Sequence, residues 1–454
     1  MKPVLFSAWL ALLLRMAAAF ADPRPRAKVP ALALGLLCGD LPKTITSALD
    51  WLDQRQQDWS SQYRLLAEAH WDVRQFFAPV LAQALQLPGD PTAPIYAGQD
   101  DTLLRKTGKR IPGTAYARDP LSPAFQVNLV LGQRFLQTAL LVRPPGEARP
   151  WRSIPVAFRH APPLKAPPRA TPEERAAVKE ARKRYNLSLI GAEELQQLRA
   201  ALDQSPAGHD RLLIDAVDGG YANRHFLQSI PERTVVVARL RKNAKLRAYL
   251  PPDQRTGPRK YGPDLPTPEA LLRDETIAWQ ELTVFVAGQL RTLHYKVVDR
   301  VCWPQGTQDR PLRLILLKPA GYRLRKGAKL LYRQPAFLLA TSLDVEVRFL
   351  IEAYLARWEL EVNFRDEKTI LGVGQAQVRS PLSVARTPAF LVAAYAALLL
   401  VCLQVFDDQR TDAFAPLPAW RKHPPLRPSA RDLITLLGKE AAAAVLPGCQ
   451  AAIA

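Results

Sequence analysis

The residues best suited to chemistry in this chain are four polar side chains at helical spacing. Tyr354, Arg357, Glu361 and Lys368 follow one another in a stretch with few helix breakers. On a helix that turns about 100° per residue, all four fall within about 60° of one another. One carboxylate then shares a face with an aromatic ring and two cations, which suits a metal ion held beside a phosphate. The simpler reading is a solvated helix face with ion pairs.

The remaining glutamates of this stretch do not belong to that face. Glu352, Glu359 and Glu367 project elsewhere, with Glu359 roughly opposite. We expect one helix that is capped by Asp344 and ends after Leu371, where two glycines follow.

Two further carboxylates follow strand-like segments earlier in the chain. Asp101 ends the segment 95–102, and Asp218 ends the apolar run 212–218 before two glycines. In open α/β sheets, reactive groups gather at the carboxyl ends of strands. With Glu361, these aspartates would supply hard oxygen ligands for two Mg²⁺ ions, which support phosphoryl displacement without a protein nucleophile. Taken alone, each aspartate would more often be a turn or cap residue.

The elements around these residues predict a mixed sheet covered by helices. We expect strands at 95–102, 125–131, 135–142, 212–218 and 234–240, the second and third joined as a hairpin at Gly132 and Gln133. Thr171-Pro-Glu-Glu174 combines an N-cap, a proline at the first helical position and a capping-box glutamate, so a charged helix should run towards Tyr185 and more helix to about Leu202. The alternation favours an α/β fold.

The rest of the chain divides by composition. Residues 44–87 show helical patterning, and 241–343 are mostly β, with strands expected at 282–287, 312–317 and 337–340. We therefore expect five regions: an N-terminal helical region, a first core part, a β-rich insertion, a second core part with the Glu361 helix, and a basic tail. Their boundaries are 1–90, 91–240, 241–343, 344–407 and 408–454.

Net charge indicates a polyanionic partner. The chain has 62 Lys and Arg against 42 Asp and Glu, a formal charge of +20. The cations are spread over many segments, which favours nucleic acid over a membrane surface. Its four cysteines form no close pair, so neither a zinc knuckle nor a disulfide framework is indicated.

Two apolar segments bear on cellular location. The apolar run 389–403 is shorter than a membrane span, so it predicts a buried core helix. Val4–Leu14 resembles a secretory signal that Arg15 interrupts; the alternatives are an amphipathic first helix or a start at Met16. We expect a cytoplasmic, nucleoid-associated protein, with the signal-like segment a decoy.

The spacing of the four helical residues resembles a motif of a known protein family. Tyr354, Arg357, Glu361 and Lys368 match every position of the YREK motif of bacterial insertion-sequence DDE transposases of the IS-four type. Asp218-Gly-Gly-Tyr221 is similar to the second acidic motif of that family, and Asp101-Thr102 to the first. The long β-rich segment before the glutamate is also a feature of this group.

This resemblance implies a ribonuclease H-like core that binds two Mg²⁺, or Mn²⁺ as a substitute, through Asp101, Asp218 and Glu361. It implies that Arg357 and Lys368 hold phosphates near the cut end and that Tyr354 contacts the DNA strand there. Cut-and-paste transposition of double-stranded DNA by a homodimer is the implied activity. Some members stack a flipped base on an aromatic residue of the insertion, for which Trp303 is a candidate unless it is a core residue.

Two choices of ligand stay open. Asp100 and Asp101 are adjacent and face opposite ways on a strand; we choose Asp101 because it precedes Thr102, as in the family. Asp215 competes with Asp218 but lies inside the apolar strand. The alternatives to a transposase are a nuclease on the same core without strand transfer, and an inactive domesticated DNA-binding protein.

Overall fold

A computed structural model describes residues 4–445 except 57, 120–121, 124, 147, 168, 287, 320, 323–326, 328, 330, 333 and 422–423. The helices are α1 (Val4–Ala17), α2 (Pro23–Cys38), α3 (Ile45–Trp51), α4 (Ser60–Ala67), α5 (Val73–Ala84), α6 (Pro172–Arg184), α7 (Leu187–Asp203), α8 (Arg224–Leu227), α9 (Pro268–Arg273), α10 (Val347–Ala356), α11 (Trp358–Thr369), α12 (Pro381–Phe406) and α13 (Ala430–Val445), with a 3₁₀ turn at Pro252–Gln254. The strands are β1 (Ile95–Arg105), β2 (Ala115–Arg118), β3 (Leu129–Val142), β4 (Arg152–His160), β5 (Leu213–Val217), β6 (Thr234–Arg239), β7 (Arg247–Ala248), β8 (Gln280–Val286), β9 (Gln289–Cys302), β10 (Leu312–Leu317), β11 (Gly321–Tyr322), β12 (Leu331–Tyr332) and β13 (Ala336–Ala340).

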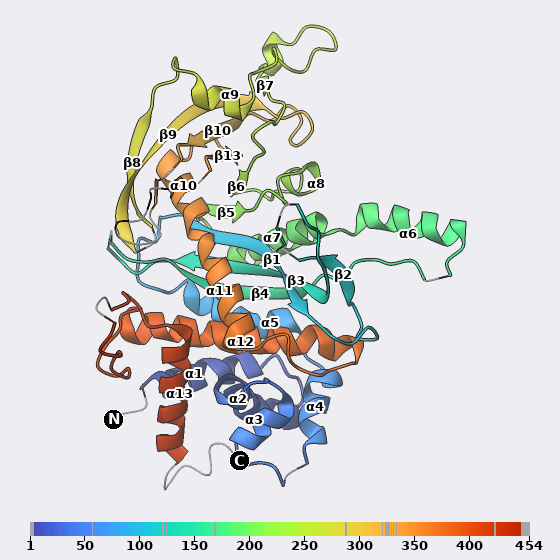
Figure 1. Ribbon diagram of the computed structural model, residues 1–454, viewed down its shortest axis with the longest axis vertical. Coiled ribbons are helices and arrows are strands. Elements are labelled where there is room, and N and C mark those ends of the chain that lie inside the picture. Colours follow the sequence, from blue (N-terminus) through green and yellow to red (C-terminus); the bar gives the residue numbers. More distant parts are fainter. Residues whose placement is uncertain are drawn as a thin grey trace.

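Most described strands form one 11-stranded mixed sheet. Its order is β2-β3-β1-β5-β6-β13-β10-β9-β7, with β4 paired to β3 and β8 to β9. The central strands β1, β5 and β6 are parallel, and the other neighbours are antiparallel. Helices flank this sheet (Figure 1). The predicted class, a mixed α/β sheet of the ribonuclease H-like type covered by helices, is confirmed.

The predicted hairpin at Gly132 and Gln133 is wrong, because both residues lie inside the single strand β3. Gly132 pairs with Arg105 of β1 on one side and with Ala115 of β2 on the other. A Cβ atom there would stand 2.7 Å from the Leu104 carbonyl oxygen. This glycine therefore permits close approach of two backbones and does not turn the chain.

Six of the described strands were missed by the sequence patterns, namely β2, β4, β7, β9, β11 and β12. β4 was not predicted, although it pairs with β3 along its whole length. β9 was missed as well, although it forms a hairpin with β8 and also pairs with β10. Within the predicted insertion, β13 pairs with β6, so the strands after residue 241 continue the central sheet.

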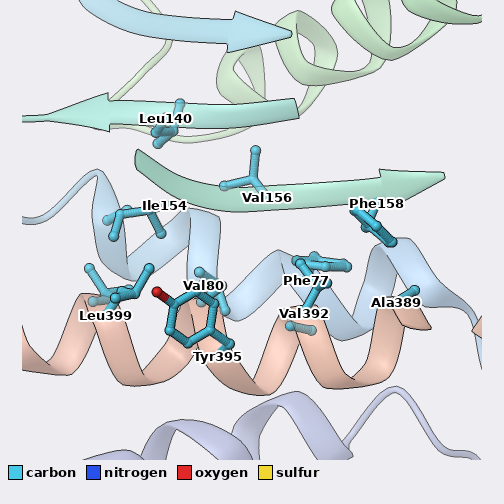
Figure 2. Packing of buried hydrophobic residues seen from close by; sticks show 14 of the residues in the cluster. Phe77, Val80, Leu140, Ile154, Val156, Phe158, Ala389, Val392, Tyr395 and Leu399 are labelled. Carbon is cyan, nitrogen blue, oxygen red and sulfur yellow. The ribbon is translucent and has the colours of Figure 1, made fainter. Parts of the chain in front are cut away.

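The main core lies beneath the sheet, around the apolar helix α12. Figure 2 shows Ala389, Val392, Tyr395 and Leu399 of this helix facing side chains of β4 and α5. Among the described residues, α12 is the one helix long and apolar enough to cross a membrane, and 83% of its most apolar stretch is buried inside the protein. The prediction of a buried core helix at 389–403 is confirmed, although the helix is longer than expected.

The N-terminal helices share this core. In α1, Leu5, Trp9, Leu13 and Met16 are fully buried, and the Trp9 indole N–H donates to the Ala394 carbonyl of α12 at 3.1 Å. The signal-like segment is therefore a core helix in this fold. At the other end, the predicted tail contains α13, which packs near α1, α2 and α12 (Figure 1).

Candidate active site

Strand β1 presents two adjacent aspartates to opposite faces of the sheet. A Cβ atom on Gly98 would stand 3.0 Å from Leu360 of α11, whereas the Gln99 side chain lies against Gly191 of α7. Because side chains alternate along a strand, Asp100 follows Gly98 towards α11, and Asp101 follows Gln99 to the opposite face. The structure thus separates the two candidates that the sequence left open.

Asp101 lies beside Asp218. Burial raises the pKa of Asp101; the Arg134 guanidinium opposes the shift, and the negative charge of Asp218 adds to it. Arg134 Nη1 is 3.3 Å from the Asp101 carboxylate, and the positive charge of Lys368 also stabilises the ionised form. Asp218 follows β5 directly, at the carboxyl end of that strand, as predicted.

Asp100 lies beside Arg357 and Glu361. Arg357 Nη1 donates to the Asp100 carboxylate at 2.8 Å and is 4.0 Å from the Glu361 carboxylate. Burial raises the pKa of Asp100 to about 7, even though Arg357 opposes the shift; Glu361 and Asp101 raise it further. Glu361 itself is 44% exposed, so its carboxylate is accessible to a ligand.

The four helical residues are divided between two helices, so the predicted single helix is wrong. Tyr354 lies in α10, Arg357 is the junction, and Glu361 and Lys368 lie in α11. Arg357 keeps right-handed helical torsions, with φ −52° and ψ −28°, so the interruption is short. Its guanidinium lies over the Tyr354 ring, 5.8 Å from the centroid.

The expected ends of this helix also need correction. α10 begins at Val347, and its cap residue Glu346 makes no side-chain cap hydrogen bond. The Asp344 N–H donates to the Ser342 hydroxyl, so this residue belongs to the preceding turn. α11 ends at Thr369, and Gly372 follows with a φ of +57°, the left-handed conformation that closes the region.

Glu352 and Glu359 pair with arginines outside the site, as predicted, and Glu367 is buried. Glu352 lies 3.2 Å from Arg348 and 3.9 Å from Arg143. Glu359 pairs with Arg427 at 2.5 Å. Glu367 is fully buried, and burial raises its pKa to about 8. These carboxyls belong to the packing of the helices.

Asp215 occupies a different environment from Asp218. It lies inside β5, opposite Ala97 of β1 and Val236 of β6, and is fully buried. Neither of its carboxyl oxygens has a hydrogen-bond partner among the described residues, and burial raises its pKa to about 7.

Sequence reasoning missed Arg134 as a member of the site. Arg134 pairs with Leu103, and Asp101 pairs with Leu136, so Arg134 and Asp101 are diagonal neighbours across β1 and β3. No local motif marks this arginine, and the predicted hairpin would have placed it elsewhere. Trp303, the candidate stacking residue, is partly buried against the main core and covers Gly306, which supports the alternative of a core tryptophan.

The structure therefore brings Asp101 to Asp218, and Glu361 to Arg357 and Asp100. Burial lowers the pKa of Lys368, and the negative charges of Glu367, Glu361 and Asp101 oppose this shift, so the ammonium lies within electrostatic range of both groups. Within the described part of the chain, however, no three His, Cys, Asp or Glu side chains are close enough to form a metal-binding group.

The donor set nevertheless fits a hard divalent cation. Asp101 and Asp218 are oxygen donors whose negative charges oppose one another, and a cation between them would remove that repulsion. Glu361 is exposed enough to turn towards such a cation.

Asp218 follows β5 as predicted, whereas Asp101 lies within β1, which continues to Arg105. A mixed sheet that brings these acidic side chains together with cations, in a strongly basic chain, fits one class: nucleic-acid-cleaving enzymes of the ribonuclease H-like type. The family model described as DDE superfamily endonuclease matches residues 15–310, and the chain belongs to this family. The matched range includes Asp101 and Asp218 and ends before α10. No match was found among curated proteins.

Proposed function

We propose that this protein is a DNA transposase of the DDE type, which cleaves transposon ends and joins them to target DNA. The observation that carries the proposal is the proximity of Asp101, which lies within β1, to Asp218, which follows the parallel neighbour β5, in a chain of the DDE endonuclease family. The family supplies the cleavage chemistry. Tyr354, Arg357, Glu361 and Lys368, at the YREK spacing, supply the narrower assignment to the insertion-sequence group.

Asp101, Asp218 and Glu361 are the residues that would hold Mg²⁺, with Mn²⁺ as a substitute. Bound in pairs, such ions activate an attacking oxygen and stabilise the leaving oxygen of a phosphodiester. Asp100 is the alternative ligand, because it lies on the face of β1 that is covered by α11, the helix of Glu361. The role of the protein is to fix these carboxylates and to bring a phosphate to them.

The cations of the site serve the DNA strand. Lys368 is exposed at the end of α11, where its ammonium can hold a phosphate beside the carboxylates. Arg357 is mostly buried, and we infer that it positions Glu361 and contacts phosphate with the remainder of its guanidinium. Tyr354 lies under that guanidinium and is half-buried, so its ring can contact the strand edge.

Transposition pairs two DNA ends, so we propose a homodimer on DNA, working in the cytoplasm at the nucleoid. The N-terminal helices are proposed to bind the transposon end. A nuclease without strand transfer and an inactive DNA-binding protein are the alternatives to this function.

The test uses duplexes copied from the DNA that flanks the gene. The purified protein is expected to nick them at inverted repeats in Mg²⁺ and not in EDTA, and to join pre-cut ends to a target plasmid. Cleavage of the ends without joining would favour the simple nuclease. Binding to the ends without any cleavage in Mg²⁺ or Mn²⁺ would favour the inactive protein.

A further inference from the structure

Helix α6 projects from the body of the protein into solvent. Figure 1 shows it extending away from the sheet at the right of the view. None of its residues is buried. A helix that is polar all round bridges to another domain or partner, is stabilised by ion pairs along its own surface, or is not stable alone.

The projecting segment is held in a defined conformation. Thr171 and Glu174 form the capping box that the sequence predicts, with Pro172 at the first helical position. The Arg182 guanidinium donates twice to the Leu164 carbonyl, at 2.8 and 3.0 Å, which ties the helix to the chain that leads out to it. We call residues 161–167 and 169–186 the arm.

Both ends of the arm start beside the candidate active site. The chain leaves β4 at His160, which pairs with Phe135 of β3, and Phe135 pairs with Thr102. His160 is thus two strands away from Thr102 in one cross-strand row, about 10 Å at ordinary strand spacing.

The second end of the arm, where the chain returns to the protein body, is hydrogen-bonded to the loop that follows β5. After α6 the chain enters α7, where the Ser188 hydroxyl accepts from the Asn223 amide at 2.8 Å. Asn223 belongs to the loop that begins at Asp218, and its amide also donates to the Gly220 carbonyl. The arm therefore extends outward from the edge at which Asp101 and Asp218 meet.

Three cations of α6 share one face of the helix. On a helical wheel, Arg175, Lys179 and Arg182 fall within about 60° of one another. Glu173, Glu174 and Glu180 lie on the opposite half together with Arg184, and Lys183 pairs with Glu180. Neither Arg175 nor Lys179 has an ion-pair partner within the described part of the chain, so this face offers free positive charge.

An apolar protein partner does not suit this helix. Its nonpolar residues are Ala176, Ala177, Val178 and Ala181, with no aromatic residue, leucine or methionine. The centres of protein–protein interfaces are enriched in aromatic residues and methionine. Unpaired Arg and Lys on one face instead match the phosphates of a nucleic acid duplex.

We propose that the arm binds the backbone of duplex DNA adjoining the strand held at the active site, with Arg175 and Lys179 contacting phosphates. This inference rests on the proposed function and names a DNA surface outside the catalytic residues. A helix of this length extends about 20 Å, enough to follow about six base pairs. These contacts carry no sequence information and fix the path of the duplex.

The test is the salt dependence of DNA binding by Arg175→Ala/Lys179→Ala in the full chain. Alanine is the strongest helix former, and neither side chain is buried, so α6 should stay folded. For a duplex longer than the arm, we expect affinity to fall about tenfold and the slope of log K against log salt to fall by about 1.8. Circular dichroism and the thermal midpoint should be unchanged.

The matched control is Arg431→Ala/Lys439→Ala, which removes the same charge from exposed positions of α13, far from α6 (Figure 1). Equal binding by the two double variants would overturn the proposal, because loss of net charge would then explain the effect. A change in oligomeric state with unchanged DNA affinity would also overturn it, in favour of contact between copies.

Different results would refute the proposed function and the proposed DNA contacts of the arm. Wild-type protein that binds DNA but never cleaves it would refute the transposase while the arm contacts stand. Mg²⁺-dependent cleavage with no difference between the double variants would refute the arm and leave the transposase.

Discussion

The Arg357 guanidinium donates a hydrogen bond to the Asp100 carboxylate at 2.8 Å, from the face of β1 opposite to Asp101. This contact ties the junction of α10 and α11 to the central strand, although 257 positions separate the two residues in the chain. Because the same guanidinium lies 4.0 Å from Glu361, we propose a positioning role for Asp100. Asp101, beside Asp218, is then the proposed ligand.

Substituting the two neighbours should therefore have unequal effects. Asp101→Asn should abolish Mg²⁺-dependent strand cleavage, because it removes a donor from the Asp218 pair. Asp100→Asn should lower cleavage about 10- to 100-fold, as expected for a residue that orients a ligand. Single-turnover cleavage rates of the two variants decide the matter. A fully inactive Asp100→Asn beside an active Asp101→Asn would reverse the assignment.

Mg²⁺ should stabilise the folded protein through Asp101 and Asp218. The cation relieves repulsion between the two carboxylates and therefore binds the native state. At a Mg²⁺ concentration a hundredfold above its dissociation constant, binding should raise the free energy of unfolding by about 2.7 kcal/mol. Thermal midpoints with and without Mg²⁺ measure the effect. Asp218→Asn should lose it, and the exposed Asp344→Asn should keep it. An unaltered Mg²⁺ shift in Asp218→Asn would rule out this site.

Asp215 should make stability depend on pH. Burial raises its pKa in the folded protein to about 7, whereas an unfolded aspartate has a pKa of about 3.9. Between these values the native state binds the extra proton, so the free energy of unfolding falls as pH rises from about 4 to about 7. Asp215→Asn removes this loss.

Urea unfolding in metal-free buffer at several pH values tests the prediction. The advantage of Asp215→Asn over wild type should grow from near zero at about pH 4 to as much as about 4 kcal/mol above pH 7. Asp100 and Glu367 titrate in both proteins and cancel in the difference. The variant should still cleave DNA, whereas Asp218→Asn should not. A difference that stays constant with pH would contradict the assignment of burial as the cause.

Trp9 should be essential for stability, since α1 is a core helix. Its side chain is fully buried and its indole N–H donates to Ala394, so Trp9→Ala should lower the free energy of unfolding by about 3–5 kcal/mol. Leu14→Ala on the same helix is the control, because Leu14 is 55% exposed. Chemical denaturation compares them. Equal stability of both variants, or a fully stable chain started at Met16, would show that α1 is dispensable.

Local signals in the sequence account for several elements of the site. The capping box at Thr171 and Glu174 starts α6 where expected, and the apolar run before Asp218 forms β5. Both patterns depend on neighbouring residues alone. Alternation along a strand also predicted that Asp100 and Asp101 face opposite ways, and the structure bears this out.

The arrangement of these elements depends on contacts between distant segments. Local sequence predicts a turn at Gly132, whereas in the structure this glycine is paired with β1 on one side and β2 on the other. Arg134 is close to Asp101 because of the register in which β3 pairs with β1. The chain by itself determined where the strand before Asp218 ends and where its charged helix begins, because short-range sterics and hydrogen bonds decide both. Only the tertiary structure decided which face each aspartate shares and with which cation, because pairing across hundreds of residues leaves no local pattern.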